Sequence, residues 1–206
     1  MRRQRHGTSG QDQRPGRART GSGRLRLIGG QFRRRLLPVL DHPGLRPTPD
    51  RVRETLFNWL VTEIDSRTRV LDLFAGTGAL GLEALSRGAG EVRFVEADRQ
   101  VAQQITRNLA TLNVAMPVHH QKAQVFLDTR PVQPFHLVFL DPPFRQNLIA
   151  DCCQRLEQEG WLAEGALIHV ETEAGLIPRL PAGWHLIRET RAGDSHTRLY
   201  RRESAQ

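Results

Sequence analysis

Short apolar runs alternate with segments of helical spacing through most of this sequence. Strands are expected at residues 70–74, 91–96, 118–120, 135–140 and 166–171. Helices are expected between them, at residues 79–87, 99–112 and 147–159. This alternation predicts an α/β fold with a doubly wound, mainly parallel sheet. Two further strands, 184–191 and 197–202, are expected to close the sheet as an antiparallel hairpin around Gly193–Asp194.

The N-terminal part of the chain follows a different pattern. Residues 1–23 contain Arg, Gly, Gln and Ser with almost no apolar side chains, so this basic arm is expected to be disordered. Residues 24–45 interleave apolar residues with arginines around Gly29–Gly30, which predicts a small basic β-hairpin. The main domain is then expected to span residues 46–206.

The main domain is expected to begin with a helix from Asp50 to Ile64. The apolar stripe of this helix consists of Val52, Leu56, Trp59 and Leu60. Arg51 and Arg53 fall outside that stripe, so both are expected on the surface. Together with the arginines of the hairpin, they would present cations to phosphates.

The composition narrows the function classes. The net charge of +8 and the pI of about 11.1 favour a polyanionic partner, which is usually nucleic acid. The two cysteines, Cys152 and Cys153, are adjacent and form neither a disulfide framework nor a zinc spacing, so we expect no metal and a reducing cytoplasm. The sequence contains no apolar run that could span a membrane and no signal-peptide core.

A glycine-rich turn follows the strand expected at 70–74. Gly76, Gly78 and Gly81 satisfy the spacing G-x-G-x-x-G and precede a helix whose N-terminus offers free N–H groups. Glu96 ends the next strand, where an acid can hold a ribose. The pattern is typical of a nucleotide site, and on its own it also allows a nicotinamide dehydrogenase.

Asp72, within the expected buried strand, favours a different ligand. A buried carboxylate is costly unless a positive or hydrogen-bond-donating group meets it. The pyrophosphate of a dinucleotide would add negative charge nearby, whereas S-adenosylmethionine carries an ammonium group and no phosphate. The segment that runs Asp-x-Phe-x-Gly-x-Gly from Asp72 therefore resembles the first motif of class I S-adenosylmethionine-dependent methyltransferases.

A second motif, Asp141-Pro142-Pro143-Phe144, follows the strand at 135–140. Ligands bind at the carboxyl ends of strands in such sheets. The prolines hold the chain extended and lack N–H groups, so the Asp141 carboxylate and the Pro142 carbonyl are free acceptors. Phe144 offers an aromatic face for a flipped base. The motif resembles that of methyltransferases acting on nitrogens conjugated to a planar group.

The sequence resembles the RsmD family in these two motifs, in the basic hairpin and in the segment from Arg46 to Leu60. That segment is the most specific of these features. The resemblance covers residues 24–202. It implies a Rossmann-like enzyme that uses S-adenosylmethionine to methylate the N2 amine of a guanine in bacterial small-subunit ribosomal RNA. We expect it to act in the cytoplasm as a monomer.

The motifs and the resemblance assign three groups of residues. The catalytic group is expected to be Asp141, Pro142, Pro143 and Phe144. The cofactor site is expected to comprise Asp72, Phe74, Ala75, Gly76, Gly78, Glu96, Ala97, Lys122, Ala123 and Asp141. Related enzymes often carry an acid at the position of Lys122, so a backbone contact is expected there. The RNA-binding group is expected to be Arg24, Arg26, Arg33, Arg34, Arg35, Arg46, Arg51 and Arg53.

Other functions stay open at this stage. The same motifs could serve an amino-methyltransferase of adenine in DNA or of protein glutamine. A nicotinamide dehydrogenase also fits the glycine spacing, although Asp72 disfavours it. Finally, the flanking arginines alone would suit an RNA-binding assembly factor without catalytic activity.

Overall fold

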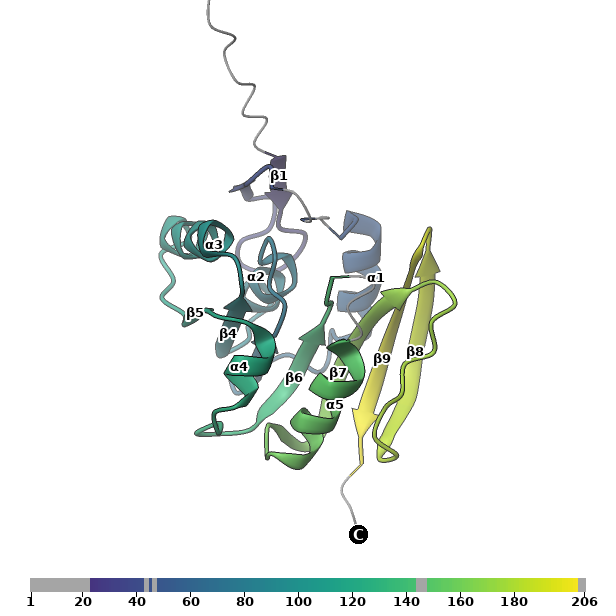
Figure 1. The fold of residues 1–206 in the computed structure, drawn as a ribbon. Helices are drawn as coiled ribbons and strands as arrows, with labels where there is room; N and C mark the ends of the chain where they lie inside the picture. Colours follow the sequence, from purple (N-terminus) through teal and green to yellow (C-terminus); the bar gives the residue numbers. More distant parts are fainter. Residues whose placement is uncertain (1–22, 43–44, 46–47, 144–147, 204–206) are drawn as a thin grey trace, which may run out of the picture.

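The computed structural model of the chain describes residues 23–42, 45, 48–143 and 148–203. Almost all of the predicted basic arm, together with Arg46 of the RNA-binding group and Phe144 of the catalytic group, lies outside the described residues. The predictions for these positions stay predictions. The described part folds around one large sheet with helices on both faces (Figure 1).

The large sheet has seven strands in the order β5-β4-β3-β6-β7-β9-β8. Its parallel strands are β3 (Arg69–Asp72), β4 (Glu91–Glu96), β5 (Val118–His120), β6 (Phe135–Leu140) and β7 (Leu162–Glu173). The antiparallel pair β8 (Trp184–Ala192) and β9 (Ser195–Arg202) closes the sheet, with β9 inserted between β7 and β8. The predicted fold class, including the closing hairpin, is therefore confirmed.

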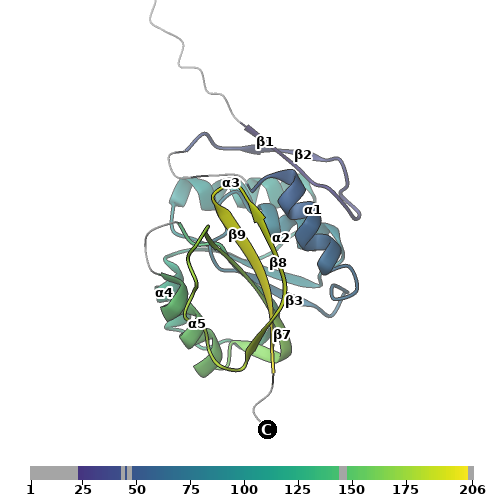
Figure 2. The ribbon, with the colours of Figure 1, turned by 90° about the vertical axis from the view of Figure 1, so that its right-hand side faces the viewer.

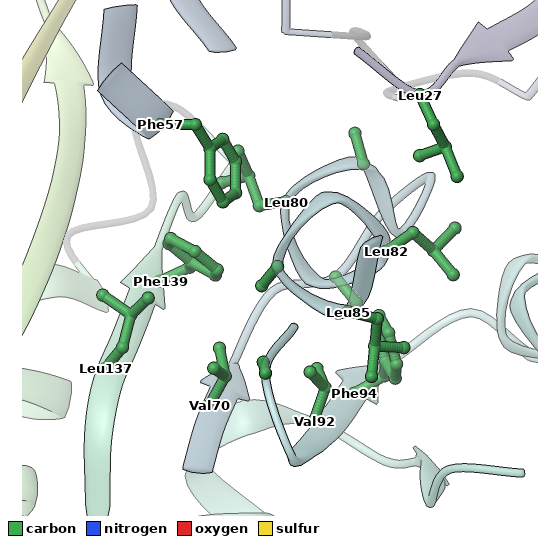
Figure 3. Packing of buried hydrophobic residues seen from close by; sticks show 14 of the residues in the cluster. Leu27, Phe57, Val70, Leu80, Leu82, Leu85, Val92, Phe94, Leu137 and Phe139 are labelled. Atoms are coloured by element: carbon green, nitrogen blue, oxygen red, sulfur yellow. The ribbon is translucent and has the colours of Figure 1, made fainter. Parts of the chain in front are cut away.

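Helices cover both faces of this sheet. One apolar cluster involves α1 (Asp50–Trp59), α2 (Ala79–Ser86) and α3 (Arg99–Thr111), and the cluster on the opposite face involves α4 (Ala123–Leu127) and α5 (Leu148–Gln158). Figure 3 shows α2 at the centre of the first cluster, with Leu80 close to Phe57 of α1 and with Val70, Val92 and Phe139 on the strands beside it. Among the described helices, none is both long and apolar enough to cross a membrane.

Three local predictions need correction. The helix expected to reach Ile64 ends at Trp59, and a turn follows it. Strand β7 starts at Leu162 rather than at residue 166, because Leu162 pairs with Phe135 of β6 before the polar stretch around Gly165. Helix α4 was not predicted, because its 5 residues are too few to show a helical period.

The predicted N-terminal hairpin is present as β1 (Gly23–Arg26) and β2 (Leu36–Val39), paired antiparallel. The connection is longer than the expected turn and spans residues 27–35. The hairpin lies across the molecule beside α1 and α3 (Figure 2). The boundary predicted between residues 45 and 46 borders residues outside the described part, and it stays a prediction.

Buried side chains and hydrogen bonds both hold the hairpin against α2. Leu25, Leu27 and Leu37 belong to the same core cluster as the helices. The fully buried carboxylate of Glu83 accepts hydrogen bonds from the backbone N–H groups of Ile28 and Gly29, each at 2.8 Å. Deleting the hairpin would therefore uncover part of the core and leave a buried carboxylate without two of its donors.

Arg53 is wrongly placed by the sequence pattern. Its side chain is only 1% exposed, and its Nη2 donates to the backbone carbonyl of Arg26 and to Asp50. The guanidinium thus links α1 to the hairpin instead of facing solvent. We therefore remove Arg53 from the group of surface cations available to phosphates.

We expect Gly81→Ala to destabilise the protein, because this glycine of α2 lies directly against Phe94 of β4. An added Cβ would lie 2.3 Å from the Phe94 ring and 3.0 Å from Asp72 Oδ2. Overpacking costs about 1–3 kcal/mol, against roughly 1 kcal/mol that alanine gains in a helix. Denaturant unfolding should show the net loss. Gly183→Ala is the control, since its Cβ would meet only Glu203 O at 3.5 Å. Equal stability of the two variants would contradict this account of the packing.

Candidate active site

The predicted site residues lie on the loops that follow four neighbouring parallel strands. The glycine turn follows β3, and the Asp-Pro-Pro segment follows β6. Strand β4 ends at Glu96 and is followed by Ala97, while β5 is followed by Lys122 and Ala123. Because the carboxyl ends of parallel strands lie at one edge of a sheet, the fold brings these loops together, as the sequence predicted. This edge is where ligands bind in open α/β sheets.

The glycine turn exposes backbone groups beside the start of α2. Gly76 and Gly78 adopt positive φ angles of 51° and 77°, a conformation that side-chain-bearing residues rarely adopt. The turn is closed by hydrogen bonds from Gly78 N to Ala75 O at 2.7 Å and from Ala75 N to Val95 O at 2.9 Å. At Gly76 and Gly78 the turn therefore presents backbone without a Cβ atom, at the N-terminus of a helix.

Asp72 ends β3 and points at the first turn of α2. Its Oδ2 accepts a hydrogen bond from Gly81 N at 2.9 Å, so the carboxylate satisfies one of the free N–H groups of that helix. Burial raises the pKa of Asp72 to about 7, with the nearby negative charge of Glu96 contributing, although the Gly81 hydrogen bond opposes the shift. A cationic ligand at this edge would stabilise the ionised form.

Glu96 is held in place by two backbone groups. Its carboxylate accepts from Gly76 N and from Asp98 N, both at 2.8 Å. These bonds join the glycine turn after β3 to the loop after β4. Each carboxylate oxygen can accept a further hydrogen bond, so Glu96 is oriented and still able to receive hydroxyl groups.

The loop after β5 presents its backbone rather than a buried polar side chain. Lys122 precedes the first residue of α4 and its side chain is exposed, whereas Ala123 is buried. Gln121 N donates to Glu96 O at 3.0 Å, which ties this loop to the end of β4. The placement is compatible with the backbone contact predicted there, and the assigned role stays a prediction.

Asp141 follows β6 and lies among other acids. It is partly buried, Pro142 is buried and Pro143 is exposed. Burial raises the pKa of Asp141 well above its usual value, and the negative charges of Glu171 and Asp72 raise it further. Among the described residues, the charged groups that shift this carboxyl are thus both acidic. The Asp141 carboxylate is consequently a stronger proton acceptor than an ordinary aspartate.

Glu171 is a site residue that the sequence prediction did not include. It lies on β7, is 7% exposed, and accepts a hydrogen bond from the Ser195 hydroxyl on Oε1. Its Oε2 is buried and has no hydrogen-bond partner in the part of the chain that the structure describes. Burial raises the pKa of Glu171, while the hydrogen bonds from Ser195 and Thr197 lower it. An acid at the end of an expected strand was a signal for this residue, since ligands bind at that edge.

The remaining arginines of the predicted RNA-binding group lie on the surface of the hairpin and of α1. Arg24, Arg33, Arg34, Arg35 and Arg51 are exposed, and exposed Arg26 pairs with Asp50 at 2.8 Å. The connection of the hairpin contacts the C-terminal ends of α2 and α3. Gln31 N donates to Ser86 O of α2 at 2.7 Å, and Arg35 Nη2 donates to Thr111 O of α3 at 3.4 Å. Val39 and Leu40, at the other end, line a small cavity with Gly76 and Thr77. The exposed cations are therefore spread along the hairpin, with Arg33, Arg34 and Arg35 at the end away from the glycine turn.

The strand order, the glycine turn after β3 and the Asp-Pro-Pro segment after β6 define a class I methyltransferase. Comparison with known proteins then gives the family. The family model described as "Conserved hypothetical protein 95" matches residues 25–201. The chain is 52% identical, over 187 residues, to "Ribosomal RNA small subunit methyltransferase D" of Escherichia coli (strain K12), which is 90% of this chain and 93% of that protein. The chain belongs to the ribosomal RNA small subunit methyltransferase D family.

Two other comparisons agree with this assignment. The protein of the same name from Haemophilus influenzae is 47% identical over 86% of this chain and 94% of that protein. The solved structure described as "Putative methyltransferase yhhF from Escherichia coli" has a TM-score of 0.81 at 50% identity, covering 88% of this chain and 99% of that one. The family predicted from the sequence motifs is therefore confirmed.

Proposed function

We propose that this protein transfers a methyl group from S-adenosylmethionine to the exocyclic N2 amine of a guanine in bacterial small-subunit ribosomal RNA. The observation that carries the proposal is the Asp-Pro-Pro segment beside the glycine turn, in a chain 52% identical to a protein named as a small-subunit ribosomal RNA methyltransferase. Ribosomal RNA is made in the cytoplasm, so we infer that the reaction takes place there. The described residues of the site come from a single chain, which is consistent with a monomer.

The residues at the carboxyl edge fit S-adenosylmethionine better than a dinucleotide. The turn at Gly76 and Gly78 leaves room for a ligand to approach the backbone, and Glu96 is oriented to receive ribose hydroxyls. Asp72 is a buried carboxylate without an ion-pair partner among the described residues. A ligand with an ammonium group would compensate that charge, whereas a pyrophosphate would be repelled. When bound, S-adenosylmethionine supplies an electrophilic methyl group on a positively charged sulfur.

Asp141 and Pro142 are suited to activate a planar amine. The lone pair of the guanine N2 is delocalised into the ring, so the amine is a poor nucleophile. The Asp141 carboxylate and the Pro142 carbonyl can accept its two hydrogens, which localises electron density on the nitrogen and fixes its direction. Once methylated, the nitrogen becomes acidic and loses a proton, so a strong base is not required.

The exposed arginines are suited to hold the RNA backbone. They lie on the hairpin and on α1, outside the strands that carry the cofactor and catalytic residues. Phosphate contacts position an RNA without reading its sequence. We therefore infer that the choice of guanine depends on RNA shape and on access of the base to Asp141.

Parallel methyl-transfer assays test the proposal against the alternatives. Radiolabelled S-adenosylmethionine should label small-subunit ribosomal particles or their RNA, and should label neither DNA nor protein. Labelled DNA or labelled protein glutamine would indicate the other amino-methyltransferase functions. RNA binding without label in any substrate would indicate an assembly factor.

We expect binding of S-adenosylhomocysteine to weaken as the pH falls. Burial raises the pKa of Asp72 to about 7, and only the ionised carboxylate can hold an ammonium group. Below about pH 7 the affinity should therefore fall by up to about tenfold for each pH unit. Calorimetry between about pH 8 and about pH 6 measures this. Asp72→Asn should bind weakly with little pH dependence, and NAD should give no heat. Binding of NAD alone would exclude the proposed cofactor.

A further inference from the structure

Asp141 and Glu171 occupy matching positions on adjacent parallel strands. Leu140 of β6 pairs with Val170 of β7 in the sheet register, and Asp141 and Glu171 are the next residue along each chain. Paired residues of neighbouring strands point to the same face of a sheet. Phe139 and His169, two residues earlier in each chain segment, are paired on that same face, and their rings lie 5.8 Å apart. We therefore expect the carboxyl groups of Asp141 and Glu171 to lie side by side as well.

The Glu171 carboxyl is held on one side only. Oε1 is fixed by the Ser195 hydroxyl of β9, and Thr197 pairs with Glu171 in the register of β7 with β9. Oε2 is buried and has no partner within residues 23–42, 45, 48–143 and 148–203. A buried carboxylate oxygen without a donor is costly, and a proton shared with a neighbouring carboxyl removes that cost. Asp141 is the acid next to it across the strands.

We propose that Asp141 and Glu171 form a carboxyl pair that takes up, as a unit, the proton lost by the target amine. The inference rests on the function proposed above. The amine nitrogen forms a bond to the methyl carbon as the bond from that carbon to sulfur breaks, and the nitrogen then gives up one proton. Asp141, which contacts the amine, receives this proton. Glu171 is a positioning residue that acts through Asp141.

The surrounding groups agree with this assignment. On the face of the pair, β3 contributes the carboxyl of Asp72, β9 contributes neutral hydroxyls, and β7 contributes His169, whose pKa burial lowers to about 3. His169 is consequently neutral. The cation of β9, Arg198, alternates with Thr197 and lies on the opposite face, where it bonds Thr172. The groups that the described parts of β3, β7 and β9 place next to the pair on this face are therefore acidic or neutral, and they favour retention of one proton by the pair.

A carboxyl titration tests the pair without cofactor or RNA. The protein is labelled with ¹³C at the aspartate carboxyl carbons, and the Asp141 resonance is assigned by its loss in Asp141→Asn. We expect the midpoint of Asp141 to move to lower pH in Glu171→Gln, because a neighbouring negative charge is removed. Glu164→Gln removes an exposed acid from the other end of β7 and should leave the midpoint unchanged. Glu171→Asp keeps the negative charge, so its Asp141 midpoint should lie close to the wild-type value.

Kinetics provide the second readout. In a plot of kcat against pH, the acid limb should move to lower pH in Glu171→Gln. The maximal kcat should fall by less than about tenfold for each unit by which the Asp141 pKa falls. Should Glu171→Gln fold poorly, Ser195→Ala changes the pair more mildly: Glu171 loses a hydrogen bond that favours its ionised form, so the Asp141 midpoint should again fall. Equal Asp141 midpoints in the wild type, in folded Glu171→Gln and in Ser195→Ala would overturn the pair. Absence of methyl transfer by the wild type would instead overturn the proposed function.

Discussion

Replacing Asp141 by alanine should lower kcat for methyl transfer by about 10²–10⁴-fold, the range expected when a positioned proton acceptor is lost. The variant keeps the backbone but removes the carboxylate that would accept hydrogens from the amine. Its affinity for S-adenosylhomocysteine should change little, because the glycine turn and Glu96 are untouched. Single-turnover transfer of a labelled methyl group, with calorimetry alongside, separates the two effects.

Two further measurements make this prediction specific to chemistry at Asp141. Asp141→Asn retains one oxygen acceptor, so it should keep more activity than the alanine variant. Neither variant should lower the stability at neutral pH, because burial raises the pKa of Asp141 and makes its ionised form a cost to the folded state above the ordinary aspartate pKa. Unchanged transfer by Asp141→Ala would falsify the assigned role.

Replacing Arg24 and Arg33 together by glutamine should weaken binding to ribosomal RNA and lower the salt dependence of that binding. Both side chains are exposed and lie on the hairpin, one in β1 and one in the connection. Each lost phosphate contact should lower the slope of log K against log salt by about one unit, so the double variant should lose about two. Filter binding over a salt series measures the slope.

The matched control changes two exposed arginines elsewhere on the protein. Arg67 precedes β3 and Arg130 precedes β6, so both lie at the amino edge of the sheet and outside the hairpin. Arg67/Arg130→Gln removes the same net charge and should leave the slope nearly unchanged. Equal slopes for the two double variants would show that the hairpin only covers the core. Point variants are needed because Leu25, Leu27 and Leu37 are buried in that core.

Most of the sheet was predictable from the sequence because each strand lies in one uninterrupted pattern. Strands β4, β5 and β6 have the expected limits, since turns and helices of clear period flank them. The cofactor and catalytic segments were also placed at one edge, because alternating strands and helices imply parallel strands that end together. Their gathering follows from topology, while their individual roles still rest on the experiments above.

What the sequence could not show depends on tertiary contacts. Arg53 was expected on the surface because a charged residue normally faces water, but the hairpin covers it and its backbone supplies an acceptor. Glu171 was missed as a site residue because its proximity to Asp141 follows only from the register of β6 with β7. Neither pairing leaves a pattern along the chain itself, and the sequence signal for Glu171 is limited to its place at the end of an expected strand.

Nucleoside analysis of the reaction product tests the central claim most directly. Small-subunit ribosomal RNA lacking the modification is incubated with the protein and S-adenosylmethionine, digested to nucleosides and analysed by mass spectrometry. The account predicts that N2-methylguanosine appears, and that Asp141→Ala fails to produce it. A methyl group on adenine or on a ring nitrogen of guanine, or an unmodified RNA with active protein substrates, would contradict the account.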